Sequence, residues 1–232
     1  MEYKTNKRGQ LMDENYYKNM FQRDMGEPDM EDHADKETIE AYRGKLPNEL
    51  LKMWEEHGWC SYANGMLWLI NPSEYETLVQ TYLKGSSIAS RELYAVARTA
   101  FGEVYLWERG KGNVADIGLL ANLIMLDAVK DRQDLTREEE EFEMVKFIGL
   151  HEPYTLDCKD SNRQLLFDRA LKKFGRLENN EMYGYKLNPA MGGKKSITNL
   201  DKVDLFVYAD IQRQLEKPDF AISDTENNTI TY

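Results

Sequence analysis

Apolar residues near position 50 recur at helical spacing and then change to the short spacing of paired strands. Three of them form one stripe of a predicted helix: Leu50, Leu51 and Trp54. Asn48 is expected to cap this helix, and Gly58 supplies its left-handed end. The aromatic segment that follows is divided by Asn64-Gly65, a strong hairpin signal. The pattern predicts a helix that leads into a β-hairpin, without residues suited to bond-making chemistry.

The same patterns place further helices and strands along the chain. Helical stripes predict helices at residues 11–24, 73–82, 136–148, 162–174 and 203–215. Alternating apolar positions predict strands at residues 93–98, 103–108, 114–120 and 123–126. Residues 205–208 fit a strand equally well, so a strand is an alternative to the last predicted helix in this segment.

Polar residues indicate where these elements begin and end. Ser73, with Glu76 three residues later, is expected to form a capping box. Thr136 is expected to cap an acidic helix start. The acidic segment 27–40 predicts a solvated linker, or alternatively an anionic contact surface, and the tail from Pro218 is expected to be frayed.

These elements indicate an α+β protein of two domains. Residues 1–130 are expected to form an antiparallel sheet with packed helices. Residues 131–232 are expected to form a smaller, mainly helical α+β domain with a glycine-rich loop at 188–193 and a polar tail. The polar segment 127–134 marks the predicted boundary between them.

The charge of the chain narrows the class of partner. Against 30 Lys+Arg stand 41 Asp+Glu, which gives a formal net charge of -11. Such a chain repels nucleic acid and anionic membranes at long range and favours cationic partners, although acidity for solubility alone is an equal alternative. The N-terminus lacks an apolar signal core, and no apolar run approaches the length of a membrane span, so we expect a cytoplasmic protein.

Candidate chemistry is sparse in this sequence. The three histidines lie outside metal-ligand spacings, and Cys60 and Cys158 form no CxxC pair, although a disulfide between them stays open. No nucleophile elbow, P-loop or dinucleotide fingerprint is present, and Gly192-Gly193-Lys194-Lys195 fits a turn better than a phosphate loop. We therefore expect no catalytic, cofactor-binding or metal-binding residues, and no enzyme.

Short motifs along residues 40–216 are similar to those of one known family. In the first half they are Tyr42-Arg-Gly-Lys-Leu-Pro47, His57-Gly58-Trp59, Leu67-Trp-Leu69 and Ala97-Arg-Thr-Ala-Phe-Gly-Glu103. In the second half they are Phe174-Gly175, Glu181-Met-Tyr-Gly-Tyr185, Pro189-Ala190 and Gly192-Gly193. With them the chain resembles bacterial immunity proteins that join a GAD-like N-terminal domain to a C-terminal immunity domain, such as type VI secretion DNase immunity proteins. The resemblance implies a non-enzymatic cytoplasmic antidote that binds and blocks a cognate nuclease toxin.

Acidic and aromatic residues are the candidate contacts with such a toxin. A nuclease presents a positive cleft to hold phosphates, and an acidic partner with aromatic anchors suits that cleft. The candidate acids are Glu138, Glu139, Glu140, Glu141 and Glu181, and the candidate anchors are Tyr183 and Tyr185. Solvated surface or core is the competing interpretation of each position.

Three alternatives differ from this function in class. A nucleic-acid-binding regulator is one, because GAD-like modules are remotely similar to an insertion domain of aminoacyl-tRNA synthetases, but the net charge opposes it. A hydrolase using His151, Asp157 and Glu181 is another, and it requires these side chains to meet in a pocket. The third is a general scaffold protein, similar to the wider immunity and cell-wall regulator superfamily.

Overall fold

The computed structural model describes residues 12–127, 134–224 and 229–231. Most of the predicted boundary segment 127–134 lies outside these ranges, and the division into two domains stays a prediction. In the described ranges we find no helix with the length and apolar content needed to cross a lipid bilayer.

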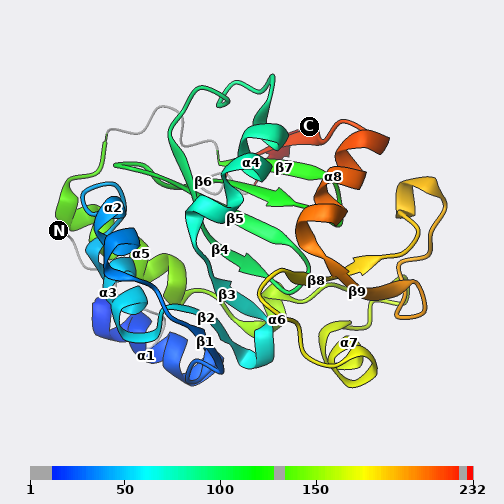
Figure 1. Ribbon diagram of the computed structural model, residues 1–232, viewed down its shortest axis with the longest axis horizontal. Helices are drawn as coiled ribbons and strands as arrows, with labels where there is room; N and C mark the ends of the chain where they lie inside the picture. Colours follow the sequence, from blue (N-terminus) through cyan, green and yellow to red (C-terminus); the bar gives the residue numbers. More distant parts are fainter. Residues whose placement is uncertain (1–11, 128–133, 225–228, 232) are drawn as a thin grey trace.

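A mixed sheet of nine strands runs through the described chain in the order β1-β2-β3-β4-β5-β6-β7-β10-β11 (Figure 1). Its strands are β1 (Met30–Asp32), β2 (Trp59–Tyr62), β3 (Leu67–Leu69), β4 (Leu93–Thr99), β5 (Glu103–Glu108), β6 (Gly112–Gly118), β7 (Leu123–Asp127), β10 (Asp219–Asp224) and β11 (Thr229–Thr231). Neighbouring strands pair antiparallel, except that β7 and β10 pair parallel. The predicted hairpin and the four predicted strands are confirmed to within two residues.

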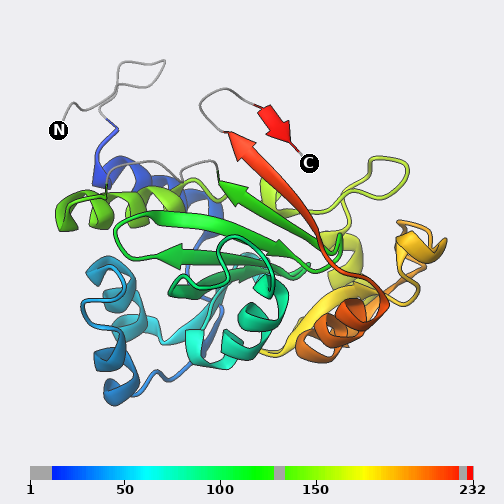
Figure 2. The same cartoon turned by 90° about the horizontal axis from the view of Figure 1, so that it is seen from above.

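Helices lie on both faces of this sheet, so the structure has three layers (Figure 2). The helices are α1 (Glu14–Met25), α2 (Lys36–Tyr42), α3 (Asn48–His57), α4 (Pro72–Leu83), α5 (Arg137–Gly149), α6 (Pro153–Leu156), α7 (Phe167–Phe174) and α8 (Leu205–Leu215). α1 and α5 cover one face, whereas α2, α3, α4 and α8 lie on the other (Figure 2). A small antiparallel sheet of β8 (Glu181–Tyr185) and β9 (Leu200–Asp204) packs against α8. The predicted α+β class is confirmed.

The core between the layers is rich in large aromatic side chains. Trp54, Trp68 and Trp107 are buried. The indole nitrogen of Trp107 finds its partner inside the core, where it donates a hydrogen bond to Glu140 at 3.1 Å. The interior of the large sheet is thereby tied to α5.

The acidic segment 27–40 is structured, so the linker prediction is wrong. It forms β1 and α2, and two of its acids serve the backbone. Asp35 caps α2 by accepting from the backbone N–H of Thr38 at 2.9 Å. Asp29 accepts from the hydroxyl of Ser61 and from the backbone N–H of Asn64. The local cap at Asp35 and the contacts of Asp29 with residues distant in sequence explain the order of this segment.

Three predicted helix starts also differ from the structure. Asn48 does not cap α3, because Pro47 occupies the N-cap position without a side-chain hydrogen bond and Asn48 is the first helical residue. Asn71 caps α4 in place of Ser73, because its side chain accepts from the Ser73 N–H at 3.2 Å. The helix predicted at 162–174 begins at Phe167. Asp157 accepts from the Phe167 N–H at 2.9 Å and Asp160 from the Gln164 N–H at 3.0 Å, so these carboxylates hold the preceding residues in turns. Side chains that bond nearby backbone compete with helix in this way.

The chain returns to the first half of the sequence near its end. Residues 200–204 form β9, and Asp204 then caps α8, so the helix alternative holds for residues 205–208. β10 follows and pairs with β7, with Phe220 opposite Ile124. The expectation of a frayed tail is therefore wrong for residues 219–224.

Candidate functional site

The predicted acidic contacts on α5 divide into structural and exposed residues. Glu140 is 2% exposed and accepts from the backbone N–H of Gly110 at 2.9 Å as well as from Trp107. The carboxylate of Glu141 accepts from the N–H groups of Asn48 at 2.8 Å and Glu49 at 2.9 Å, which begin α3. These two acids hold α5 against its neighbours, and Glu140 offers no surface to a partner.

Three other predicted acids reach the surface. Glu138 and Glu139 are exposed in the first turn of α5, where Thr136 caps the helix as predicted. Hydrogen bonds from Thr136 lower the pKa of Glu139 and keep it ionised. Glu181 is half-buried and pairs with Lys202 at 2.7 Å. These acids remain proposed contacts.

The two predicted aromatic anchors face the interior. Tyr183 is fully buried, and its hydroxyl donates to the carbonyl of Gly175 at 2.7 Å. Tyr185, two residues along the same strand, points to the same side and is 5% exposed. Both side chains pack in the core, so in this structure neither offers a surface to a toxin.

The residues of the hydrolase alternative have separate structural partners. Nδ1 of His151 lies 2.7 Å from the carbonyl oxygen of Phe147, and burial lowers the pKa of this histidine. Asp157 accepts backbone N–H groups at the start of α7, and Glu181 pairs with Lys202. Among the described residues, we find no group of three His, Cys, Asp or Glu placed to hold a metal ion. Cys60 and Cys158 are free thiols.

Exposed apolar side chains gather beside α8. Five large ones are about half exposed, from 47% to 58%: Leu187, Met191, Val207, Ile211 and Leu215. They line a hollow of about 260 Å³ between α8 and the loop that follows β8. Three of them recur every four residues and form one stripe on the outer face of α8. We call this set of five residues the α8 apolar surface.

Helical spacing in the sequence places Val207, Ile211 and Leu215 on one face of this helix, and in the structure that face points to solvent. α8 carries a second apolar stripe, and that one is buried: Leu205, Tyr208 and Ala209. Only one stripe can face the sheet, and Val207, Ile211 and Leu215 are left on the outside. Two apolar stripes on one helix therefore indicate that one of them faces a partner, because only one can face the core.

The loop opposite α8 is held in a defined shape. The side chain of Asn199 donates to the carbonyls of Leu187 at 2.8 Å and Lys194 at 3.0 Å. Asn188 bonds to Gln212 of α8, which fixes the loop to the helix. A Cβ at position 193 would lie 1.9 Å from the Leu187 carbonyl oxygen, so this close approach requires glycine. The predicted turn is confirmed, and it forms a rigid rim of the apolar surface.

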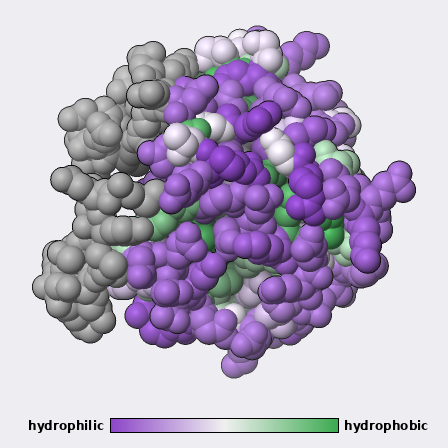
Figure 3. All heavy atoms as spheres, turned by 90° about the vertical axis from the view of Figure 1, so that its left-hand side faces the viewer, coloured by the Kyte–Doolittle hydropathy of each residue, from purple (hydrophilic) through white to green (hydrophobic). Residues whose placement is uncertain are grey.

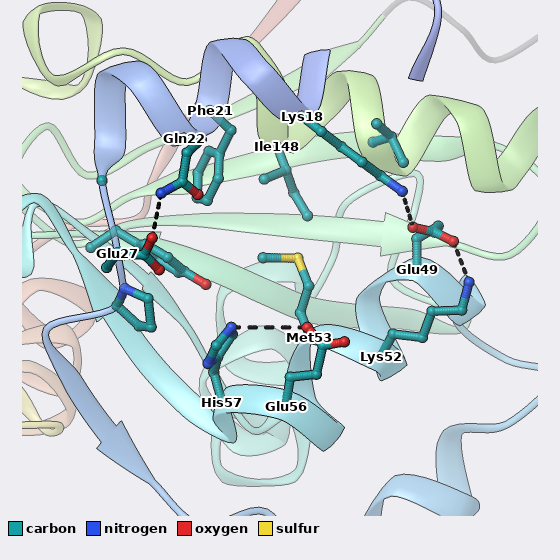
Figure 4. A pocket seen from close by; sticks show the side chains of 14 residues that line it. Lys18, Phe21, Gln22, Glu27, Glu49, Lys52, Met53, Glu56, His57 and Ile148 are labelled. Carbon is teal, nitrogen blue, oxygen red and sulfur yellow. Dashed lines mark hydrogen bonds and ion pairs between the residues drawn. The ribbon is translucent and has the colours of Figure 1, made fainter. Parts of the chain in front are cut away.

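A second hollow lies between α1 and α3, with α5 behind it (Figure 4). It has a volume of about 340 Å³. Its walls combine apolar side chains, such as Phe21 and Met53, with charged side chains, such as Lys18 and Glu49 (Figure 4). We call it the α1–α3 groove.

Charge is unevenly divided between the two halves of the chain. Residues 16–121 carry 17 Asp+Glu against 11 Lys+Arg, whereas residues 141–216 carry 12 of each. The α1–α3 groove is therefore formed mainly by the acidic half, and the α8 apolar surface belongs to a neutral half.

Asp116, on β6, gives the protein a pH-dependent stability. Burial and the charge of Glu103 raise its pKa to about 7, well above the value of about 4 in an unfolded chain. The folded state therefore binds this proton more tightly, and stability falls as pH rises from about 4 to about 7. Asp116→Asn is expected to match wild type at pH 4 and to be more stable by about 1–2 kcal/mol at pH 8. Urea denaturation at both pH values measures this, and equal pH dependence of the two proteins would contradict it.

Comparison with known proteins agrees with the layout of the two halves. The family described as GAD-like domain matches residues 16–121, and the family described as T6SS immunity protein Tdi1, C-terminal, matches residues 141–216. The resemblance predicted from the sequence is thus confirmed for both parts. The α8 apolar surface lies wholly within the second match.

One solved structure is similar over nearly the whole chain. The crystal structure of Atu4351 from Agrobacterium tumefaciens superimposes with a TM-score of 0.81 at 21% sequence identity. The alignment covers 93% of this chain and 96% of that chain, and at this identity it shows a shared fold. Among curated proteins, no sequence matches this chain significantly.

Proposed function

We propose that this chain neutralises a cognate DNase toxin, because its two halves match the models described as GAD-like domain and as T6SS immunity protein Tdi1, C-terminal. The family match supports an immunity role in type VI secretion. In the proposed function the protein acts in the cytoplasm, binds the toxin stoichiometrically and catalyses nothing.

The α8 apolar surface carries this proposal. Contiguous apolar side chains that remain exposed on a folded protein mark contact surfaces, because covering them removes apolar area from water. Five of them meet here around a rigid loop, inside the residues that match the immunity domain. A surface already held in its binding shape loses little entropy when a partner covers it.

The proposed mechanism follows from the chemistry of a nuclease. Its cleft is positively charged, so the acidic half of this chain steers the two proteins together. The α8 apolar surface then makes the short-range contact and covers the cleft or displaces catalytic residues. Glu138, Glu139 and Glu181 are the acids of the original candidate set that remain available to contact the toxin.

Charged substitutions on the outer stripe of α8 test the proposal. Val207→Asp with Ile211→Asp is expected to weaken toxin binding by about 100-fold or more, because two carboxylates would be buried in an apolar contact. Both side chains are half exposed, so the fold is expected to persist. The matched control is Leu150→Asp with Tyr154→Asp, which changes two exposed apolar residues elsewhere in the same half. Plasmid cleavage by the toxin, titrated with each variant, is the measurement.

Full plasmid cleavage in the presence of equimolar wild-type protein would overturn the proposed function. Loss of protection by the control variant to the same degree would show that α8 has no special role. A salt-dependent shift of DNA or tRNA by the purified chain would favour the nucleic-acid-binding alternative instead.

A further inference from the structure

The α1–α3 groove has an apolar floor that no described element covers. Phe21 of α1, Tyr62 of β2 and Ile148 of α5 line this floor. Met53 of α3 reaches toward Phe21 and Ile148 (Figure 4). Each of the first three side chains is at least 92% buried, whereas Met53 is partly exposed. The floor therefore consists of packed apolar side chains, and the flexible side chain of Met53 can adapt to a bound partner.

The rim of the groove is acidic. Glu49 accepts from Lys18 at 2.8 Å and from Lys52 at 2.5 Å, so one ion-pair chain links α1 to α3 across the mouth (Figure 4). Glu27 and Glu56 stand on the rim as exposed side chains. The described residues that line the groove, together with their ion-pair partners, include five carboxylates and two ammonium groups. The carboxylates are Glu14, Glu27, Glu31, Glu49 and Glu56, and the ammonium groups are Lys18 and Lys52.

The surface around the groove is otherwise polar. Seen from the side of α1 and α3, the molecule is largely hydrophilic, and apolar atoms show mainly in its recesses (Figure 3). A partner must therefore offer an apolar side chain for the floor and cations for the rim. Exposed ion pairs contribute about 0–1 kcal/mol each, so a cation from outside replaces Lys18 at little cost.

We infer that the α1–α3 groove docks a basic, amphipathic segment of the toxin, at a site separate from the α8 apolar surface. This inference rests on the proposed function and adds a second contact to it. The charge complementarity of the acidic rim selects lysine or arginine, and the floor accepts their aliphatic stems or a neighbouring apolar side chain. Two contacts on one partner raise the overall affinity, because the second binding event is intramolecular.

Charge reversal at the rim distinguishes binding at this groove from attraction by the net negative charge of the protein. The test variant is Glu27→Lys with Glu56→Lys, and the control is Asp168→Lys with Glu178→Lys, which makes the same charge change at exposed positions in the other half. The probe is the purified nuclease toxin of the plasmid-cleavage test above, and its association and dissociation are followed on immobilised full-length protein at several salt concentrations. The rim variant is expected to slow association by about tenfold at low salt and to flatten its salt dependence, while the control changes it less than about twofold.

A filled floor tests the apolar half of the inference. Met53→Trp occupies the groove without a change of charge and is expected to raise the dissociation rate by about tenfold. Unfolding temperatures of all variants are measured alongside, and only variants that unfold within a few degrees of wild type are compared.

The outcomes separate this inference from the proposed function. Toxin that binds wild type but is unaffected by both the rim and the floor variants overturns the groove site and leaves the immunity role intact. Equal effects of the rim variant and the control also overturn it, because they reveal steering by net charge alone. Toxin that fails to bind wild type overturns the proposed function and the groove site together.

Discussion

Arg98→Ala is expected to lower the free energy of unfolding by about 3–5 kcal/mol. Arg98 lies on β4, is fully buried, and stacks over Trp68 with 4.4 Å between its guanidinium carbon and the ring centroid. Its guanidinium donates to the carbonyls of Asn179 at 3.0 Å and Thr99 at 3.3 Å. The substitution removes these donors and leaves a cavity next to the indole ring. Urea denaturation followed by circular dichroism is the measurement.

The size of the loss is explained by the position of Arg98 between the two halves of the chain. Burial lowers the pKa of this guanidinium, which shows the desolvation cost of keeping a cation here. The Asn179 carbonyl that accepts from Arg98 belongs to the turn before β8, so the arginine holds that turn against the large sheet.

Arg98→Met is the matched control, because it keeps most of the volume and removes the charge. Its expected loss is about 1–3 kcal/mol, since carbonyl groups lose a donor but no large cavity forms. If alanine and methionine destabilise the protein equally, packing beside Trp68 is unimportant. If neither does, the buried cation contributes nothing net to stability.

Glu140→Ala is expected to cost about 2–4 kcal/mol of folding free energy. The substitution leaves the buried indole N–H of Trp107 and the backbone N–H of Gly110 without an acceptor. Arg137, which lies 3.2 Å from the other carboxylate oxygen, loses its buried partner as well. Thermal and urea denaturation report the loss.

Two comparisons give this prediction its controls. Glu140→Gln retains an acceptor oxygen in the same place and is expected to cost about half as much. Glu138→Ala, two residues earlier on the exposed side of α5, is expected to change stability by less than about 0.5 kcal/mol. Toxin affinity of folded Glu140→Ala protein is expected to equal that of wild type, and a large loss of affinity without destabilisation would restore Glu140 as a contact residue.

Local signals predict much of this fold from the sequence. The glycine after α3, the Asn-Gly turn and the Thr136 cap act within a few residues of themselves, and all three are found where expected. The strands β4 to β7 follow one another through short turns, so their alternation is enough to place them. These elements can be predicted from a single sequence because the interactions that determine them are local.

The candidate site depends on partners that are distant in sequence. Glu140 is one acid among several in its helix, and only the approach of Trp107, 33 positions away, makes it a buried acceptor. The period of β8 places Tyr183 and Tyr185 on one side, but the core around Phe101 and Phe167 decides which side. In α8, apolar spacing identifies the stripe that contains Val207. In the structure, however, the competing stripe that contains Leu205 packs against the sheet and is buried. Sequence patterns therefore give sets of residues, and tertiary contacts assign them to inside or outside.

The parallel pairing of β10 with β7 constrains how this protein can be dissected. A fragment that ends near residue 217 leaves the N–H and C=O groups along one side of β7 without strand partners. Exposed strand edges promote association between chains, so such a truncation is a poor reagent for assigning roles to either half. A recombinant GAD-like fragment needs residues 219–224 supplied with it, by circular permutation or as a separate peptide.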